Sequence, residues 1–99
     1  MKGVLNNKML KVYRIQKGTI KEIQIVNYLS AKMGFLPTQL GNTHAWHCDE
    51  LNYAVGFEGE NQRGLRVKTI YVNVVEEKRQ TTIKRHLESL CTRQGLSLK

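Results

Sequence analysis

The chain has 99 residues, a hydrophobic content of 40%, and 16 basic against 8 acidic residues, which gives a formal net charge of +8. This length allows one small domain with one core and excludes an enzyme built from two domains around a cleft. Residues 1–10 lack the apolar segment of a signal peptide, and no apolar run approaches the roughly 18 residues of a membrane span. We therefore expect a single-domain, cytoplasmic protein that does not contact membranes.

The first part of the chain predicts a strand followed by a helix. Residues 9–16 alternate polar with apolar side chains, which is typical of a short strand near a sheet edge. Thr19 and Glu22 have the spacing of a capping box, and apolar residues then recur at helical spacing until Gly34. These signals predict a helix over about 19–34. Residues 36–43, which contain a proline and a glycine, are typical of a loop or tight turn.

The middle of the chain is typical of antiparallel strands. A strand pattern begins at His44, and Tyr53, Val55 and Phe57 alternate with small or polar residues. Residues 58–64 are polar and glycine-containing, so we expect a turn there, followed by a β-branched strand at 67–75.

The last part predicts a second helix over about 82–94, capped by Thr81 or Thr82 and closed by Gly95. The order of strand, helix, three strands and helix predicts an α+β fold. Both helices then lie on one face of an antiparallel sheet of three to four strands. If residues 96–99 add a final strand, the alternative is a ferredoxin-like βαββαβ arrangement.

The positive charge indicates a polyanionic partner or an acidic protein partner. Basic residues dominate residues 1–47 and 61–99, whereas all charged residues within 48–60 are acidic. Nucleic acid is favoured over lipid, because neither predicted helix has a bulky apolar face opposite a lysine-rich face. Cys48 and Cys91 are expected to be reduced thiols, since a chain that builds its own core needs no disulfide framework.

Residues 41–50 concentrate the chemically versatile side chains, including His44, Trp46, His47 and Cys48. A zinc site is disfavoured, because strand alternation places His47 on the face opposite the other three. We expect neither a metal nor another cofactor.

A metal-free ribonuclease requires less of this segment. Cleavage of RNA by its own 2′-hydroxyl needs a base such as His44 and cations that balance charge on the phosphorus. The pattern leaves open whether His44 faces solvent or packs in the core, and whether Trp46 stacks on a base or is buried. The pattern also leaves open whether the side chains of Asn42 and Thr43 bind a phosphate or their own backbone.

Five basic residues are candidates for binding phosphates: Lys68, Lys78, Arg79, Lys84 and Arg85. A helix that starts at Thr81 or Thr82 would add free backbone N–H groups beside two of them.

Four segments together resemble one known family: Met33-Gly34-Phe35 at the end of the first helix, Gly41-Asn42-Thr43-His44, Ile70-Tyr71-Val72-Asn73-Val74, and the second helix with its Arg93-Gln94-Gly95-Leu96-Ser97 tail. The chain resembles the HicA (YcfA-like) mRNA-interferase toxins. The resemblance implies a double-stranded-RNA-binding-domain-like fold (β-α-β-β-β-α), His44 as the catalytic residue, and an antitoxin-like protein partner.

The residues and the resemblance together favour a small basic RNA-binding protein, a toxin-like, metal-independent endoribonuclease of a toxin–antitoxin system. The alternatives are a non-catalytic RNA- or DNA-binding module, such as a regulator of a mobile element, and a scaffold for an acidic protein. An exposed His44 beside basic residues favours the first, and a His44 buried under the first helix favours a binding role.

Overall fold

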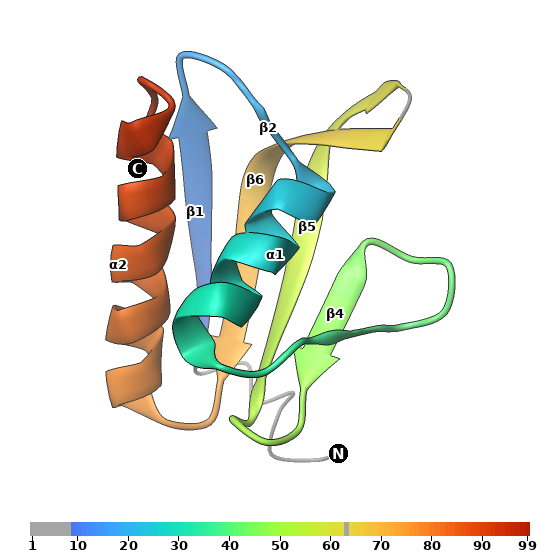
Figure 1. The fold of residues 1–99 in the computed structure, drawn as a ribbon, viewed down its shortest axis with the longest axis vertical. Helices are drawn as coiled ribbons and strands as arrows, with labels where there is room; N and C mark the ends of the chain where they lie inside the picture. Colours follow the sequence, from blue (N-terminus) through green and yellow to red (C-terminus); the bar gives the residue numbers. More distant parts are fainter. Residues whose placement is uncertain (1–8, 63) are drawn as a thin grey trace.

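The structure of the protein, a computed structural model, describes residues 9–62 and 64–99 and has an α+β fold (Figure 1). Residues 1–8, where the sequence lacks the apolar segment of a signal peptide, lie outside the described residues. In chain order the elements are β1 (Leu10–Gln16), β2 (Ile20–Lys21), α1 (Glu22–Met33), β3 (Thr38–Gln39), β4 (Ala45–Cys48), β5 (Tyr53–Gln62), β6 (Gly64–Val74), α2 (Glu77–Arg93) and β7 (Ser97–Leu98).

The strands form one antiparallel sheet in the order β3-β4-β5-β6-β1-β7. Strand β2 also pairs with β6, next to β1. The sequence predicts its four longer strands, β1, β4, β5 and β6. The expected count of three to four strands is too low, because β2, β3 and β7 bring the described sheet to seven strands. Each of these three strands has only two residues, which is too short for an alternating pattern to appear in the sequence.

Both helices lie on one face of the sheet, as expected (Figure 1). Alternate residues of the strands, such as Tyr13, Val55 and Val72, point to this face and are buried. Helix α1 buries Ile25, Val26 and Leu29 against them, and α2 buries Ile83, Leu87 and Leu90. The core is therefore a single layer between the sheet and the helices, and the opposite sheet face carries no helix in the described chain.

Helix α1 begins three residues later than the capping-box pattern predicts. The hydroxyl of Thr19 accepts a hydrogen bond from Nε of Arg66 at 2.8 Å, and the N-cap position is Lys21, without a side-chain cap. Because β2 pairs Ile20 and Lys21 with β6, the chain stays extended until Glu22. The predicted end is confirmed, since Gly34 adopts φ 86° and its N–H donates to the carbonyl of Ser30.

Helix α2 begins at Glu77, more than one turn before the predicted start at Thr82. Buried Gln80 holds this first part against the sheet: its amide donates to the carbonyls of Met9 (2.7 Å) and Val72 (3.2 Å) and accepts from the hydroxyl of Tyr13 (3.0 Å). The hydroxyl of Thr82 donates to the carbonyl of Lys78 within the helix. The prediction of a helix N-terminus at Thr81 or Thr82 is therefore wrong.

The hairpin of β5 and β6 is longer than predicted. Strand β5 continues through the polar residues to Gln62, and the position of the turn, residue 63, lies outside the described residues. A register irregularity at Glu58 and Gly59 accommodates this extension. Pairing with β4 ends earlier, where Phe57 N–H donates to the carbonyl of His44 at 3.0 Å. From Glu58 onward, the outer edge of β5 has no strand partner within the described chain.

A final strand also exists, since β7 pairs Leu98 with Ile15 of β1. The βαββαβ alternative requires this strand, but it also requires two strands between the helices, and the described chain has four. Cys48 and Cys91 are free and buried, as expected. Neither helix of the described chain is long and apolar enough to cross a bilayer.

Candidate histidine site

A tight turn places His44 directly before β4. The turn between β3 and β4 is closed by the Leu40 N–H, which donates to the carbonyl of Ala45 at 2.8 Å, and it contains Gly41 at φ 61°. The hydroxyl of Thr43 donates to the carbonyl of Leu40 (2.6 Å) and accepts from the Ala45 N–H (3.2 Å). The hydroxyl of Thr43 thus binds the backbone and stabilises the turn. This is one of its two predicted roles, the other being binding of a phosphate.

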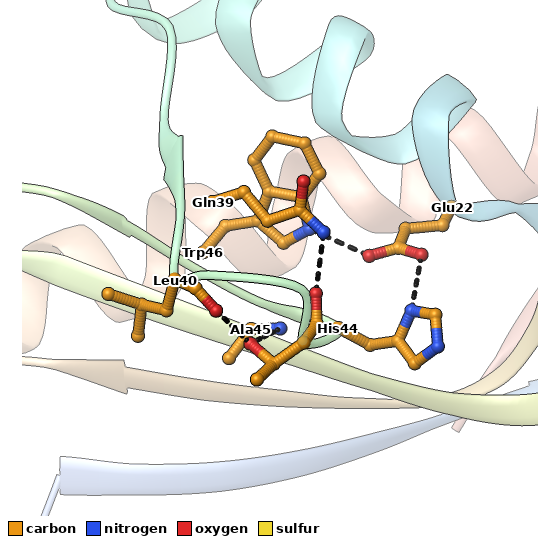
Figure 2. Close-up of polar contacts among 7 residues, drawn as sticks. Glu22, Gln39, Leu40, His44, Ala45 and Trp46 are labelled. Atoms are coloured by element: carbon orange, nitrogen blue, oxygen red, sulfur yellow. Dashed lines mark hydrogen bonds and ion pairs between the residues drawn. The ribbon is translucent and has the colours of Figure 1, made fainter.

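The imidazole of His44 is bound by a carboxylate. Its Nδ1 lies 2.8 Å from Oε1 of Glu22, and Nε1 of Trp46 donates to Oε2 of the same carboxylate at 2.7 Å (Figure 2). The Glu22 side chain is only 12% exposed, whereas that of His44 is 50% exposed. Because an ionised carboxylate only accepts hydrogen bonds, the contact requires a proton on Nδ1, and in the neutral form of the ring the lone pair of Nε2 is then free. This is the arrangement of a histidine prepared for general base catalysis.

Two elements bring these groups together. His44 lies two residues before Trp46, and its carbonyl continues the pairing of β4 with β5, so the two side chains leave the same face. Glu22 is the first residue of α1, where the helix dipole also favours a carboxylate. Glu22 was not predicted as a site residue, because the capping-box pattern gave it a structural role. The available signal was a histidine and a tryptophan on one strand face, but nothing local indicates that the start of α1 packs there.

Two hollows flank this group. One, of about 470 Å³, is lined by His44, Phe57, Glu58, Gly59 and Leu65. The other, of about 250 Å³, is lined by Lys21, Glu22, Ile23, Trp46, Gly64 and Leu65. Lys21 is the one basic residue among these linings. A ligand of nucleotide size therefore has room beside the exposed edge of His44.

One of the five predicted phosphate-binding residues lies at this end of the sheet. Lys68 sits at the irregularity in β6, opposite Glu58 and Gly59, and its Nζ lies 3.9 Å from Oε2 of Glu60. Neither Lys68 nor Glu60 lines the hollow beside His44.

The other four predicted residues lie on α2, which begins at the opposite end of the sheet (Figure 1). Lys78 and Arg79 are in its first turns, and Arg79 pairs with Glu76 at 3.4 Å. Lys84 lines a separate hollow of about 300 Å³ between β1 and α2, and Arg85 is the next residue along the helix. The start of α2 carries Glu76 and Glu77, which disfavour a phosphate there. The structure therefore does not gather these four residues around His44.

The second histidine of this segment is separate from the first. His47 pairs with Ala54 on the sheet face without helices, and its Nδ1 lies 3.0 Å from Oδ1 of Asp49. Among the described residues, no three histidine, cysteine, aspartate or glutamate side chains gather as metal ligands would. Burial raises the pKa of Cys48. The pKa of half-buried His86 is lowered by burial and, to a smaller extent, by the positive charges of Lys32 and Arg85.

Comparison with known proteins found no matching family model, no similar curated protein and no similar solved structure.

Proposed function

We propose that the protein is a metal-independent endoribonuclease that cleaves mRNA, with His44 as general base. The observation that carries the proposal is the Glu22–His44 pair, which holds a half-exposed imidazole beside a hollow of nucleotide size. The net charge of +8 supports a polyanionic substrate. The resemblance to HicA-like toxins points to the same activity, and the order β1, α1, β4, β5, β6 and α2 is compatible with a double-stranded-RNA-binding-domain-like fold.

In the proposed reaction, Nε2 of His44 takes the proton from the ribose 2′-hydroxyl. The 2′-oxygen forms a bond to phosphorus and the bond from phosphorus to the 5′-oxygen breaks, which leaves a 2′,3′-cyclic phosphate. The 5′-oxygen leaves with a proton from water. Glu22 stays ionised, keeps the ring in position and offsets the charge of the imidazolium, while Trp46 fixes the second oxygen of Glu22.

Cations near His44 would balance the charge that develops on the phosphate. Lys21 and Lys68 are the basic side chains that we assign to this task, since they lie at the same end of the sheet. The basic residues of α2 would then contact a more distant part of the same RNA. A strongly basic toxin also suits an acidic antitoxin-like protein.

The test compares wild-type protein with His44→Ala on a labelled, structured RNA in the presence of EDTA, read by gel for cleavage and for shift. We expect His44→Ala to lower the cleavage rate by at least about 10²-fold while RNA binding and the circular dichroism spectrum persist. His47→Ala is the matched control, because it removes the same side chain from the opposite face of the same strand. An equally active His44→Ala protein contradicts the proposal.

A non-catalytic nucleic-acid-binding module is the second candidate. The observation in its favour is that four of the predicted phosphate-binding residues lie on α2, away from His44. It predicts a strongly salt-dependent shift of the RNA without cleavage by either protein in the same experiment.

A further inference from the structure

Cations from both helices meet on the outer surface of the helix layer, where α1 and α2 lie side by side (Figure 1). Two of them lie over the ring of Tyr28 on α1. Nζ of Lys32 from the same helix and Cζ of Arg93 from α2 are each 5.5 Å from the ring centroid. Each cation is in the last turn of its helix, where the helix dipole favours it. The dipole does not explain why two helices direct their cations to one ring.

Arg85 of α2 belongs to the same group. Burial lowers the pKa of His86, and the positive charges of Lys32 and Arg85 lower it further. A cation of α1 and a cation of α2 therefore both lie near this half-buried imidazole. The side chains of Lys32, Arg85 and Arg93 are exposed, and we term these three residues the interhelical basic cluster.

The charge of the interhelical basic cluster is not neutralised within residues 9–62 and 64–99. None of its three cations forms an ion pair there, and contact with an aromatic face holds a cation without cancelling its charge. Glu88, the described acid nearest to Arg85 in sequence, acts on β1 instead, because after burial its charge raises the pKa of Tyr13. Like charges held together repel one another, so a bound anion would relieve this repulsion.

The side chains of the cluster favour phosphates over an acidic protein surface. Protein interfaces depend on aromatic and apolar anchors at their centre, and none of the exposed large apolar side chains of the described chain belongs to the cluster. The one aromatic ring, Tyr28, is partly buried and already contacts two cations. Arginine and lysine side chains without an apolar centre suit the phosphate oxygens of a nucleic-acid backbone.

We propose that the interhelical basic cluster binds the phosphate backbone of RNA at a distance from His44. Lys32 lies ten residues after Glu22 on α1, which is about 15 Å along the helix, and Glu22 is the residue that binds His44. An RNA that reaches both places therefore spans several nucleotides. Binding depends on the cluster alone, whereas a contribution of the cluster to cleavage rests on the proposed function.

The first test measures RNA binding at several salt concentrations, in the His44→Ala protein so that the RNA stays intact. In this background we compare Arg93→Gln with Arg14→Gln. The control removes the same charge from the sheet face without helices, because exposed Arg14 alternates with buried Tyr13 and Ile15. Each lost phosphate contact lowers the slope of log K against log salt by about 0.7–0.9, or the affinity about 5- to 8-fold at 0.1 M salt. We expect this loss for Arg93→Gln and not for Arg14→Gln.

The triple variant Lys32→Gln/Arg85→Gln/Arg93→Gln should lose affinity for RNA on the order of 10²-fold, with an unchanged circular dichroism spectrum. If it does not fold, the three single substitutions decide. Equal RNA affinity of the triple variant and its parent, or equal losses in Arg93→Gln and Arg14→Gln, overturns the inference. Poly-L-glutamate is the comparison ligand. A triple variant that loses binding of this polymer and keeps RNA assigns the cluster to an acidic protein, which also overturns the inference.

The second test separates the cluster from the proposed cleavage. A dinucleotide is too short to reach from His44 to the cluster, so kcat/KM is measured for a long RNA and for a dinucleotide. The ratio of the two values should fall by roughly 10²-fold in the triple variant and stay constant in Arg14→Gln. If wild type cleaves neither substrate, the proposed function fails and the binding test alone decides the cluster. If wild type cleaves both and the triple variant keeps the ratio, the inference fails and the proposed function stands.

Discussion

The substitution Glu22→Gln tests the candidate site most directly, because it changes the hydrogen-bond roles and keeps the shape. The carboxylate accepts from Nδ1 of His44 at 2.8 Å and from Nε1 of Trp46 at 2.7 Å. An amide accepts through its oxygen and donates through its nitrogen. If the oxygen keeps the bond to Trp46, the amide nitrogen faces Nδ1, so Nδ1 becomes the acceptor and the ring proton moves to Nε2.

The expected size of the effect follows from these two bonds. Hydrogen bonds to charged groups contribute about 1.5–3 kcal/mol and neutral ones about 0.5–1.5 kcal/mol. Both bonds become neutral in Glu22→Gln, so we expect the free energy of unfolding to fall by about 1–3 kcal/mol. Because the exposed Nε2 then carries the proton and no longer acts as a base, RNA cleavage should fall by about 10²- to 10⁴-fold.

The assay reads the tautomer directly. Long-range ¹H–¹⁵N NMR spectra of the neutral histidine rings distinguish a proton on Nδ1 from one on Nε2. We expect the Nδ1–H form of His44 in wild type and the Nε2–H form in Glu22→Gln, while the signals of His47 serve as an internal control. If the variant keeps the wild-type tautomer of His44 and the wild-type cleavage rate, the assigned role of Glu22 is refuted.

Three further substitutions test the fold. Gly59→Ala should lower the free energy of unfolding by about 1–3 kcal/mol or more, because the new Cβ would lie 2.0 Å from the Arg66 carbonyl; Gly56→Ala, with only ordinary contacts, is its control in urea denaturation. Leu87→Ala should cost about 2–5 kcal/mol, since Leu87 is 1% exposed, and a cost under 1 kcal/mol in the same assay contradicts the described core. Burial lowers the pKa of His86 below its ordinary value of 6.5, so the unfolded chain takes up a proton first as the pH falls, and stability decreases. His86→Gln should lose less stability than wild type between about pH 7 and pH 5, and equal losses would contradict the assignment.

The sequence predicted the longer elements because each carries its own periodic pattern. The end of α1 at Gly34 is correct, since it depends on one residue with a left-handed backbone. The predicted starts of both helices are wrong because contacts with distant segments determine them. Pairing of β2 with β6 makes α1 begin later, and contacts of Gln80 with β1 and β6 make α2 begin earlier. Such contacts between distant segments leave no trace in local spacing.

The candidate site was predictable only in part for the same reason. His44 was identifiable because it follows a glycine turn and begins a strand, which places it near the surface. Its partner Glu22 lies 22 residues earlier, and only the packing of α1 beside β4 brings the two together. The sequence favoured a catalytic role if His44 is exposed beside basic residues. His44 is exposed, but most of the predicted basic residues lie elsewhere, on α2.

The outer edge of β5, which has no strand partner from Glu58 onward among the described residues, affects how copies of this protein meet one another. A free strand edge is a template for pairing with a strand of another chain, which leads to association or aggregation. Exposed Glu58 and Glu60 place negative charge along this edge. Two copies that approached through β5 would bring like charges together, so their repulsion opposes pairing between them. These acidic side chains thus help to keep the free edge of β5 from pairing with a neighbouring copy.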